Sequence, residues 1–365
     1  MHSHEAGLRL VLNAVATSAA RYGLAIEPLL SLSIDFYTKF FIKVTKSPQS
    51  VKFLASKTML VYSCDSGCGA WETQPMLRSK PAPNKKGSGA FYKHTMAQGP
   101  SADRHCEHCG MKMHINGPMY GGHIHSQEFI ERLLAQIPEA DPSIYGTMPR
   151  LEGMLRTALE EYLPGPEVKE PVDPKDAQLA TVDHYPFFII PSRLANVVSC
   201  VTPSEDMVRG ALIHLGYRTA RSHCRPGSIK TDAPWSTIWW IITEWIRQKS
   251  PIKESSIKKN SAAWKILTDA GIIGQEKREA TGETAKDDSA MEGVEQQSSE
   301  APVENTADAP NGDGKLLLSE AELRKTLVFD ENLARLARRR GEQKLVRYQM
   351  NPRENWGPLA KASRR

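Results

Sequence analysis

The sequence lacks several features that would place it in common protein classes. It has no run of about 18 apolar residues, the length that a helix needs to cross a bilayer, so no membrane span is expected. The first residues, Met1–Glu5, carry no basic stretch and no small-residue cleavage site, so no secretory signal is expected. Neither G-x-x-x-x-G-K-[ST] nor G-x-G-x-x-G occurs, which argues against a nucleotide phosphate loop within these 365 residues.

Cysteine is scarce, and its spacing is informative. Six cysteines without a secretory signal favour a reducing compartment, where close cysteine pairs indicate metal binding rather than disulfides. Four of them form two such pairs, Cys64 with Cys68 and Cys106 with Cys109. Thiolates at this spacing are typical of structural Zn²⁺ sites. The sequence therefore predicts one zinc ion; the alternative is four unrelated buried thiols.

The residues around these pairs refine the prediction. Gly69 and Gly110 follow the second cysteine of each pair, where a tight metal-binding loop needs a residue that can adopt a positive φ. Residues 80–89, between the pairs, are rich in Lys, Pro and Gly and are interpreted as an exposed insertion loop. A closed four-cysteine site is structural, so it identifies no chemistry by itself. Three nearby histidines are alternative ligands: His105, His108 and His114.

The net charge of +5 conceals an asymmetry. Residues 275–314 contain 11 acidic and 3 basic residues, so the remaining chain has a net charge of +13. A basic body suggests a polyanionic partner such as a nucleic acid; the alternative is an ordinary solvated surface. Residues 275–314 also contain no aromatic residue and few aliphatic ones, so we expect a disordered acidic linker there.

Hydrophobic periodicity predicts an α+β fold. Apolar residues recur at helical spacing over residues 5–22, and residues 36–44 and 58–62 have the composition of strands. Residues 1–60 are therefore interpreted as the end of an α/β domain. Helices are predicted over 127–136 and 150–162, whereas residues 116–125 are interpreted as a turn-rich return from the zinc site.

Residues 180–250 have a pattern that resembles a winged-helix arrangement. A helix at about 194–201 is followed by a second with a capping box at Thr202–Glu205, which ends at Gly216. Residues 217–230 predict a two-stranded ribbon, and Asp232 is expected to cap a final helix. That helix carries an apolar stripe that we expect to form core rather than a base-stacking surface: Trp235, Ile238, Trp239, Ile242, Trp245 and Ile246.

Two basic clusters are candidate phosphate-binding sites. The first lies on the predicted ribbon and comprises Arg218, Arg221, His223, Arg225 and Lys230. The second is Arg338-Arg339-Arg340, in a basic C-terminal helix and tail over residues 315–365. The alternative for the second cluster is a solvated helix face. The expected domains are 1–60, 61–125 around the zinc site, 126–274 as the nucleic-acid-binding domain, 275–314 as the linker and 315–365.

Six further stretches, together with the cysteine pairs, extend over nearly the whole chain. The stretches are SHEAGLRL at 3–10, PLLSLSIDFY at 28–37, NGPMYGG at 116–122, GYRTARSH at 216–223, IKTDAPW at 229–235 and YQMNPRENWGP at 348–358. Together they resemble the tRNA guanine-26 N2-dimethyltransferase family, in which they occur in the same order. The last of them resembles the end of fungal members.

The resemblance implies a specific activity. Members of this family transfer methyl groups from S-adenosylmethionine to the guanine N2 at tRNA position 26. A class I methyltransferase domain precedes a C-terminal domain that holds the tRNA, and some members bind zinc through four cysteines. The implied fold is thus the C-terminal remnant of a class I methyltransferase α/β domain, a four-cysteine zinc knuckle and a winged-helix-like domain. Fungal relatives act in the nucleus and the mitochondrion, and no obligate protein partner is evident.

The family's cofactor loop and its Asp-Pro-Phe-Gly stretch do not occur in this sequence. Val172–Lys175 is no substitute, because Lys stands where the aromatic residue belongs, and Asp183–Tyr185 reads better as the start of a strand. We therefore expect no catalytic or S-adenosylmethionine-binding residues here, and a C-terminal portion that is inactive alone. The alternative is a non-catalytic zinc-ribbon and winged-helix protein that binds nucleic acid.

Overall fold

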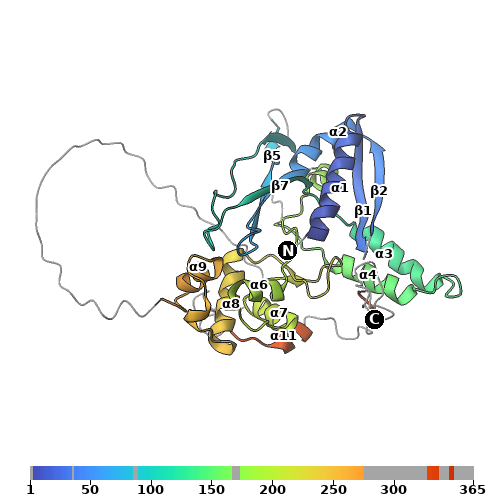
Figure 1. Cartoon of the computed structure of the whole chain (residues 1–365). Helices are drawn as coiled ribbons and strands as arrows, with labels where there is room; N and C mark the ends of the chain where they lie inside the picture. The colour runs from blue at the N-terminus through green and yellow to red at the C-terminus, as the bar shows by residue number, and fades with distance from the viewer. Residues whose placement is uncertain are drawn as a thin grey trace, which may run out of the picture.

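Strands dominate the first third of the chain and helices the remainder (Figure 1). The computed structural model describes residues 3–34, 37–84, 89–166, 173–274, 327–336 and 345–348. The predicted acidic linker and Arg338-Arg339-Arg340 lie outside the described residues. Mixed helices and sheets confirm the α+β class. No helix in the described ranges is long and apolar enough to cross a membrane.

An amphipathic helix and a hairpin begin the chain. Helix α1 (Ser3–Ala20) buries Leu8 and Leu12, which recur at helical spacing, against the antiparallel strands β1 (Leu24–Ile34) and β2 (Tyr37–Lys46). The predictions of a helix and of a strand after residue 36 are confirmed. β2 is mostly exposed, so the hairpin is covered chiefly through β1.

A three-stranded sheet leads into the cysteine pairs. Its order is β4 (Trp71–Pro75), β3 (Thr58–Ser63), β7 (His114–Tyr120), with both pairings antiparallel. The predicted strand at 58–62 is confirmed, but the prediction of turns over residues 116–125 is wrong in its first half. Pro118 is tolerated because β7 is an edge strand, where a missing N–H breaks no ladder bond.

The interpretation of residues 80–89 as a loop is also wrong in part. Strands β5 (Leu77–Pro83) and β6 (Ala90–Met96) form a two-stranded hairpin that packs on the 3-10 helix η1 (Lys52–Lys57), which directly follows the short helix α2 (Pro48–Val51). Two prolines fit into β5 because both edges of a two-stranded ribbon are free of further partners.

Helices α3 (Gln127–Gln136) and α4 (Met148–Glu160) confirm the two predicted helices, with the short 3-10 helix η2 (Ile137–Glu139) between them. They form a small core with β1, and α5 (Pro174–Ala180) follows. The buried residues of this core are Leu30, Leu32, Ile130, Leu155 and Ala158.

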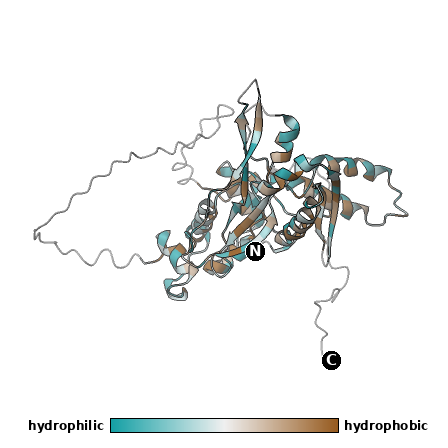
Figure 2. Ribbon diagram, turned by 90° about the horizontal axis from the view of Figure 1, so that it is seen from above, coloured by the Kyte–Doolittle hydropathy of each residue, from teal (hydrophilic) through white to brown (hydrophobic). Residues whose placement is uncertain are grey.

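The remaining elements form a helical lobe, below the strands in Figure 1. Trp239 and Trp245 of its helix α8 are only 4 and 6 % exposed, which confirms that the stripe forms core. Figure 2 shows that the helices of the structure carry both apolar and polar residues. The elements are α6 (Pro191–Val198), α7 (Glu205–His214), α8 (Trp235–Lys249), η3 (Glu254–Ser256), α9 (Ala262–Asp269) and α11 (Glu331–Leu336).

The predicted ribbon is present but short. Strands β8 (Thr219–Ala220) and β9 (Lys230–Thr231) pair over two residues each, between α7 and α8. Both predicted helix caps need correction. Ser204, not Thr202, accepts the N–H of Met207 at the start of α7. Asp232 does not cap α8, because its carboxylate binds Arg218 instead.

Candidate metal centre and nucleic-acid interface

The two cysteine pairs come together at the end of the three-stranded sheet. Cys64 directly follows β3, and the hydrogen bond from its N–H to the Ala70 carbonyl folds the first pair into a tight loop. The Sγ atoms of Cys64 and Cys109 are 3.3 Å apart, and those of Cys68 and Cys106 are 3.5 Å apart. All four sulfurs lie within 4.8 Å of one another and are buried. The structure thus groups the four predicted ligands.

The backbone of both loops has the predicted form. Gly69 has φ +80° and donates its N–H to the Cys64 carbonyl, and Gly110 has φ +74° and donates to the Cys106 carbonyl. Residues that carry a side chain rarely adopt a positive φ, so glycine is favoured at both positions. Gly67 is constrained by space, because a Cβ there would lie 2.5 Å from Cys64 Sγ.

The sulfur cluster fits a tetrahedral metal ion. Zn–S bonds of about 2.3 Å place sulfurs about 3.8 Å apart in a regular tetrahedron, close to the separations found here. Hydrogen bonds from Cys106 and the other two thiols lower the pKa of Cys109, whereas hydrogen bonds to Cys106 and Cys109 raise the pKa of Cys64 and Cys68. The alternative ligands lie outside the group: His108 pairs with Glu107, and His114 faces Asp65.

The predicted basic ribbon divides into surface and interior residues. The side chain of Arg218 is 42 % exposed and pairs with Asp232, and Arg225 is half-buried with no ion-pair partner among the described residues. Arg221 is 17 % exposed and is held by Glu205 at 2.6 Å. Arg218 and Arg225 are therefore the residues of this cluster that can meet a phosphate without rearrangement.

His223 and Lys230 are not available to phosphates. Their side chains are 0 and 4 % exposed, and each faces a buried carboxylate. Lys230 Nζ lies 3.3 Å from Glu5, whose charge raises the lysine pKa although burial alone would lower it. The two predicted tRNA contacts are thus corrected to interior positions that hold the lobes together.

A buried charge network that the sequence did not reveal surrounds Lys230. Arg9 donates to Glu5 at 2.8 Å and to Asp183 at 2.5 Å, and also to the carbonyls of Tyr120 and Gly122. Burial opposes the ionised form of Asp183, but Arg9, Lys230 and His123 together outweigh it and lower the pKa to about 2. The only sequence signal was the i, i+4 spacing of Glu5 and Arg9.

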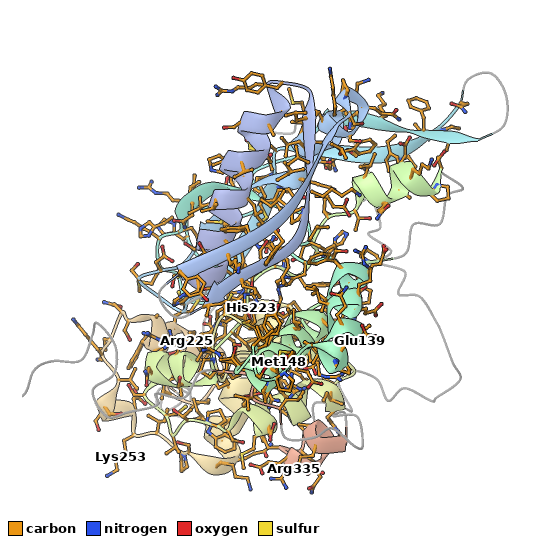
Figure 3. All side chains as sticks on the ribbon, turned by 90° about the vertical axis from the view of Figure 1, so that its right-hand side faces the viewer. Glu139, Met148, His223, Arg225, Lys253 and Arg335 are labelled. Atoms are coloured by element: carbon orange, nitrogen blue, oxygen red, sulfur yellow. The ribbon has the colours of Figure 1, made fainter. Side chains whose placement is uncertain are left out.

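A second buried group lies where the hairpin meets the helical lobe (Figure 3). Glu161 accepts from His223 Nδ1 at 2.6 Å, and His125 Nε2 lies 3.7 Å from its other oxygen. The opposite nitrogens of the two imidazoles accept the backbone N–H groups of Ser31 and Ser33. The potential metal-ligand atoms of His125, Glu161 and His223 lie within 4.8 Å of one another. Because both imidazoles accept backbone N–H groups of β1, we interpret the group as a structural link rather than a metal site.

Comparison with known proteins identifies the family. The family described as N2,N2-dimethylguanosine tRNA methyltransferase matches residues 1–170 and 177–243. The chain belongs to this family. The resemblance seen in the sequence is confirmed, and the alternative of an unrelated non-catalytic nucleic-acid-binding protein is not favoured.

Several similar proteins are named as tRNA methyltransferases. The tRNA (guanine(26)-N(2))-dimethyltransferase of Schizosaccharomyces pombe is 34 % identical over 99 % of this chain and 52 % of that protein. The mitochondrial enzyme of Saccharomyces cerevisiae is 33 % identical over 98 % of this chain and 52 % of its own length. The human enzyme is 33 % identical over 73 % of this chain and 36 % of its own. The chain thus spans about half the length of the yeast relatives.

Among solved structures, Trm1 from Pyrococcus horikoshii in complex with S-adenosyl-L-methionine has a TM-score of 0.46. It is 18 % identical, over 66 % of this chain and 50 % of that one.

Proposed function

We propose that this chain is the zinc-containing, tRNA-holding part of an S-adenosylmethionine-dependent tRNA guanine-26 N2-methyltransferase. The observation that carries the proposal is the match to a tRNA (guanine(26)-N(2))-dimethyltransferase over 99 % of this chain. The fungal relatives also suggest where it acts, in the nucleus or the mitochondrion, since one of them is named as mitochondrial.

Zinc has a structural role in this proposal. Four buried cysteines would fill all four positions of a tetrahedral ion and leave none for substrate or water. The ion would instead fix the two loops against the helical lobe, because the sulfurs belong to the same core cluster as Leu194 and Leu212. Removing it should loosen that contact.

The tRNA-binding unit is the helical lobe with its short ribbon. Helices α6 and α7, the ribbon β8–β9 and helix α8 follow one another in winged-helix order, which supports a nucleic-acid-binding role for the exposed Arg218 and the half-buried Arg225. The basic residues Arg338-Arg339-Arg340 are proposed as a further electrostatic anchor.

Catalysis is not assigned to the described residues. Guanine N2 is a poor nucleophile, so methyl transfer needs an oxygen acceptor beside it and a sulfonium held in line. The three buried carboxylates, Glu5, Glu161 and Asp183, are each engaged with a cation or an imidazole. None is placed to accept a proton from a substrate, so the chain alone should bind tRNA without methylating it.

Salt-dependent binding tests the proposal. Fluorescence anisotropy with an unmodified tRNA transcript gives log Kd against log salt, and each lost phosphate contact flattens the slope by about 0.7–0.9. Arg218→Ala/Arg225→Ala should weaken binding and flatten the slope. The control, Lys253→Ala/Arg335→Ala, removes the same charge at the far end of the lobe (Figure 3) and should change neither. Failure of the wild-type chain to bind tRNA would overturn the proposal.

A further inference from the structure

A cavity of about 510 Å³ lies between the cysteine cluster and the helical lobe. Its walls come from β4, from the loop around Cys106, from residues 184–189 and from the start of α8. The volume is within the range of small-ligand sites and suits one nucleotide better than a polymer strand. Neither Arg218 nor Arg225, the proposed phosphate contacts, lines this cavity.

Aromatic rings form much of this wall. Trp71, Tyr185 and Trp235 line the cavity and are each only half-buried. Trp71 meets Trp235 at 4.6 Å between ring centroids and Phe187 at 5.9 Å, with both ring pairs close to perpendicular. Such edge-to-face contacts fix the rings in place. Trp235 therefore departs from the rest of the α8 stripe, since it faces a cavity rather than the core.

The backbone at the cavity wall is strained. Phe187 has φ +72°, a conformation that costs a non-glycine residue about 1–3 kcal/mol and often marks a functional site. Its N–H donates to Glu5 at 2.9 Å, and the Arg9 guanidinium lies 5.5 Å from its ring centroid. Glu5 and Arg9 of the buried charge network thus hold the backbone at Phe187 in place, in addition to joining the two lobes.

The charges around the cavity exclude a phosphate as its occupant. None of the lining residues, all within the described ranges, is lysine or arginine, whereas Glu72, Asp103 and Glu107 contribute carboxylates. Burial lowers the pKa of His184, so this imidazole is neutral near pH 7. The complementary ligand is flat and carries N–H donors. Arg218 lies just outside, 5.6 Å from the Tyr185 ring centroid, where it can meet a phosphate joined to such a ligand.

We propose that this cavity binds an unstacked nucleobase of the tRNA, with the base held by the aromatic wall and its N–H groups facing Glu72. Guanine fits best, because its N1–H and 2-amino group present two adjacent donors to one carboxylate. The inference rests on the proposed function. It adds a base-specific contact to binding that would otherwise depend on phosphates alone.

Two variants test the cavity while leaving the charges of Arg218 and Arg225 in place. Stacking of one base contributes about 1–3 kcal/mol by alanine substitution, so Tyr185→Ala should weaken tRNA binding by about 5- to 150-fold with an unchanged salt slope. Glu72→Gln keeps the shape of an exposed side chain and should weaken binding by about fivefold or more. The control Tyr22→Ala removes a tyrosine that is 77 % exposed in the turn after α1, and should leave binding unchanged.

Saturation-transfer NMR with free nucleosides adds a test of base identity. Guanosine should give signals that Glu72→Gln reduces, and inosine, which lacks the 2-amino group, should give weaker ones. Wild-type affinity in both Tyr185→Ala and Glu72→Gln would overturn the cavity assignment. The proposed function would then still stand if Arg218→Ala/Arg225→Ala weakened binding, whereas a wild-type chain that bound no tRNA would overturn both.

Discussion

Replacing Lys230 distinguishes an interior ion pair from a surface phosphate contact. Lys230→Met keeps most of the side-chain volume but removes the charge that lies 3.3 Å from Glu5 Oε1. Breaking a buried pair by removing one partner costs about 3–5 kcal/mol, because the other charge stays buried. Arg9 still contacts the same oxygen at 2.8 Å, so we expect a loss at the lower end of this range, about 3 kcal/mol of unfolding free energy.

The assay is urea denaturation of the zinc-loaded chain, followed by circular dichroism. Glu5→Gln/Lys230→Met should lose less stability than the two single changes together, with a coupling of about 1 kcal/mol or more. Arg225→Met, at a half-buried position of the same segment, should change stability by no more than about 0.5 kcal/mol. Native stability in Lys230→Met together with weakened tRNA binding would refute the interior assignment.

Two further predictions concern the cysteine cluster and acid. Gly67→Ala places a Cβ 2.5 Å from Cys64 Sγ, so elemental analysis should find well under the one zinc per chain expected of the wild type. The control Gly7→Ala, with open space in α1, should retain zinc and gain up to about 1 kcal/mol of unfolding free energy. Full zinc in Gly67→Ala would contradict the crowding argument. The pKa of Asp183 is lowered from 3.8 to about 2, so its contribution, about 2–3 kcal/mol, is present above pH 4 and is lost as the pH falls towards 2. Asp183→Asn should flatten stability against pH in that window, and an unchanged acid profile would show that Arg9 does not stabilise the ionised carboxyl.

Local patterns made the cysteine cluster predictable. Each pair closes within five residues, and Gly69 and Gly110 show in the sequence where the loops need positive φ. Helix α3 was predictable for the same reason, since its apolar period and its limits are local properties. The strand status of β7 was not, because only its pairing with β3 outweighs the turn preference of Gly117 and Pro118.

Long-range pairing explains why the basic ribbon was only partly understood. Glu5 and Lys230 are separated by 225 positions, so no local pattern shows that the lysine is neutralised in the interior. His223 is similar, because its partner Glu161 comes from the end of another helix. Arg218 is exposed and Arg225 is half-buried, so their role as phosphate contacts stays a prediction.

We propose that this chain holds tRNA but does not itself transfer the methyl group. The direct measurement incubates the zinc-loaded chain with an unmodified tRNA transcript and tritiated S-adenosylmethionine, then separates bound from free tRNA on a filter. We expect the protein to retain the tRNA and the tritium in the tRNA to stay at background level. Tritium incorporation well above background, or tRNA that the chain does not retain at low salt, would contradict it.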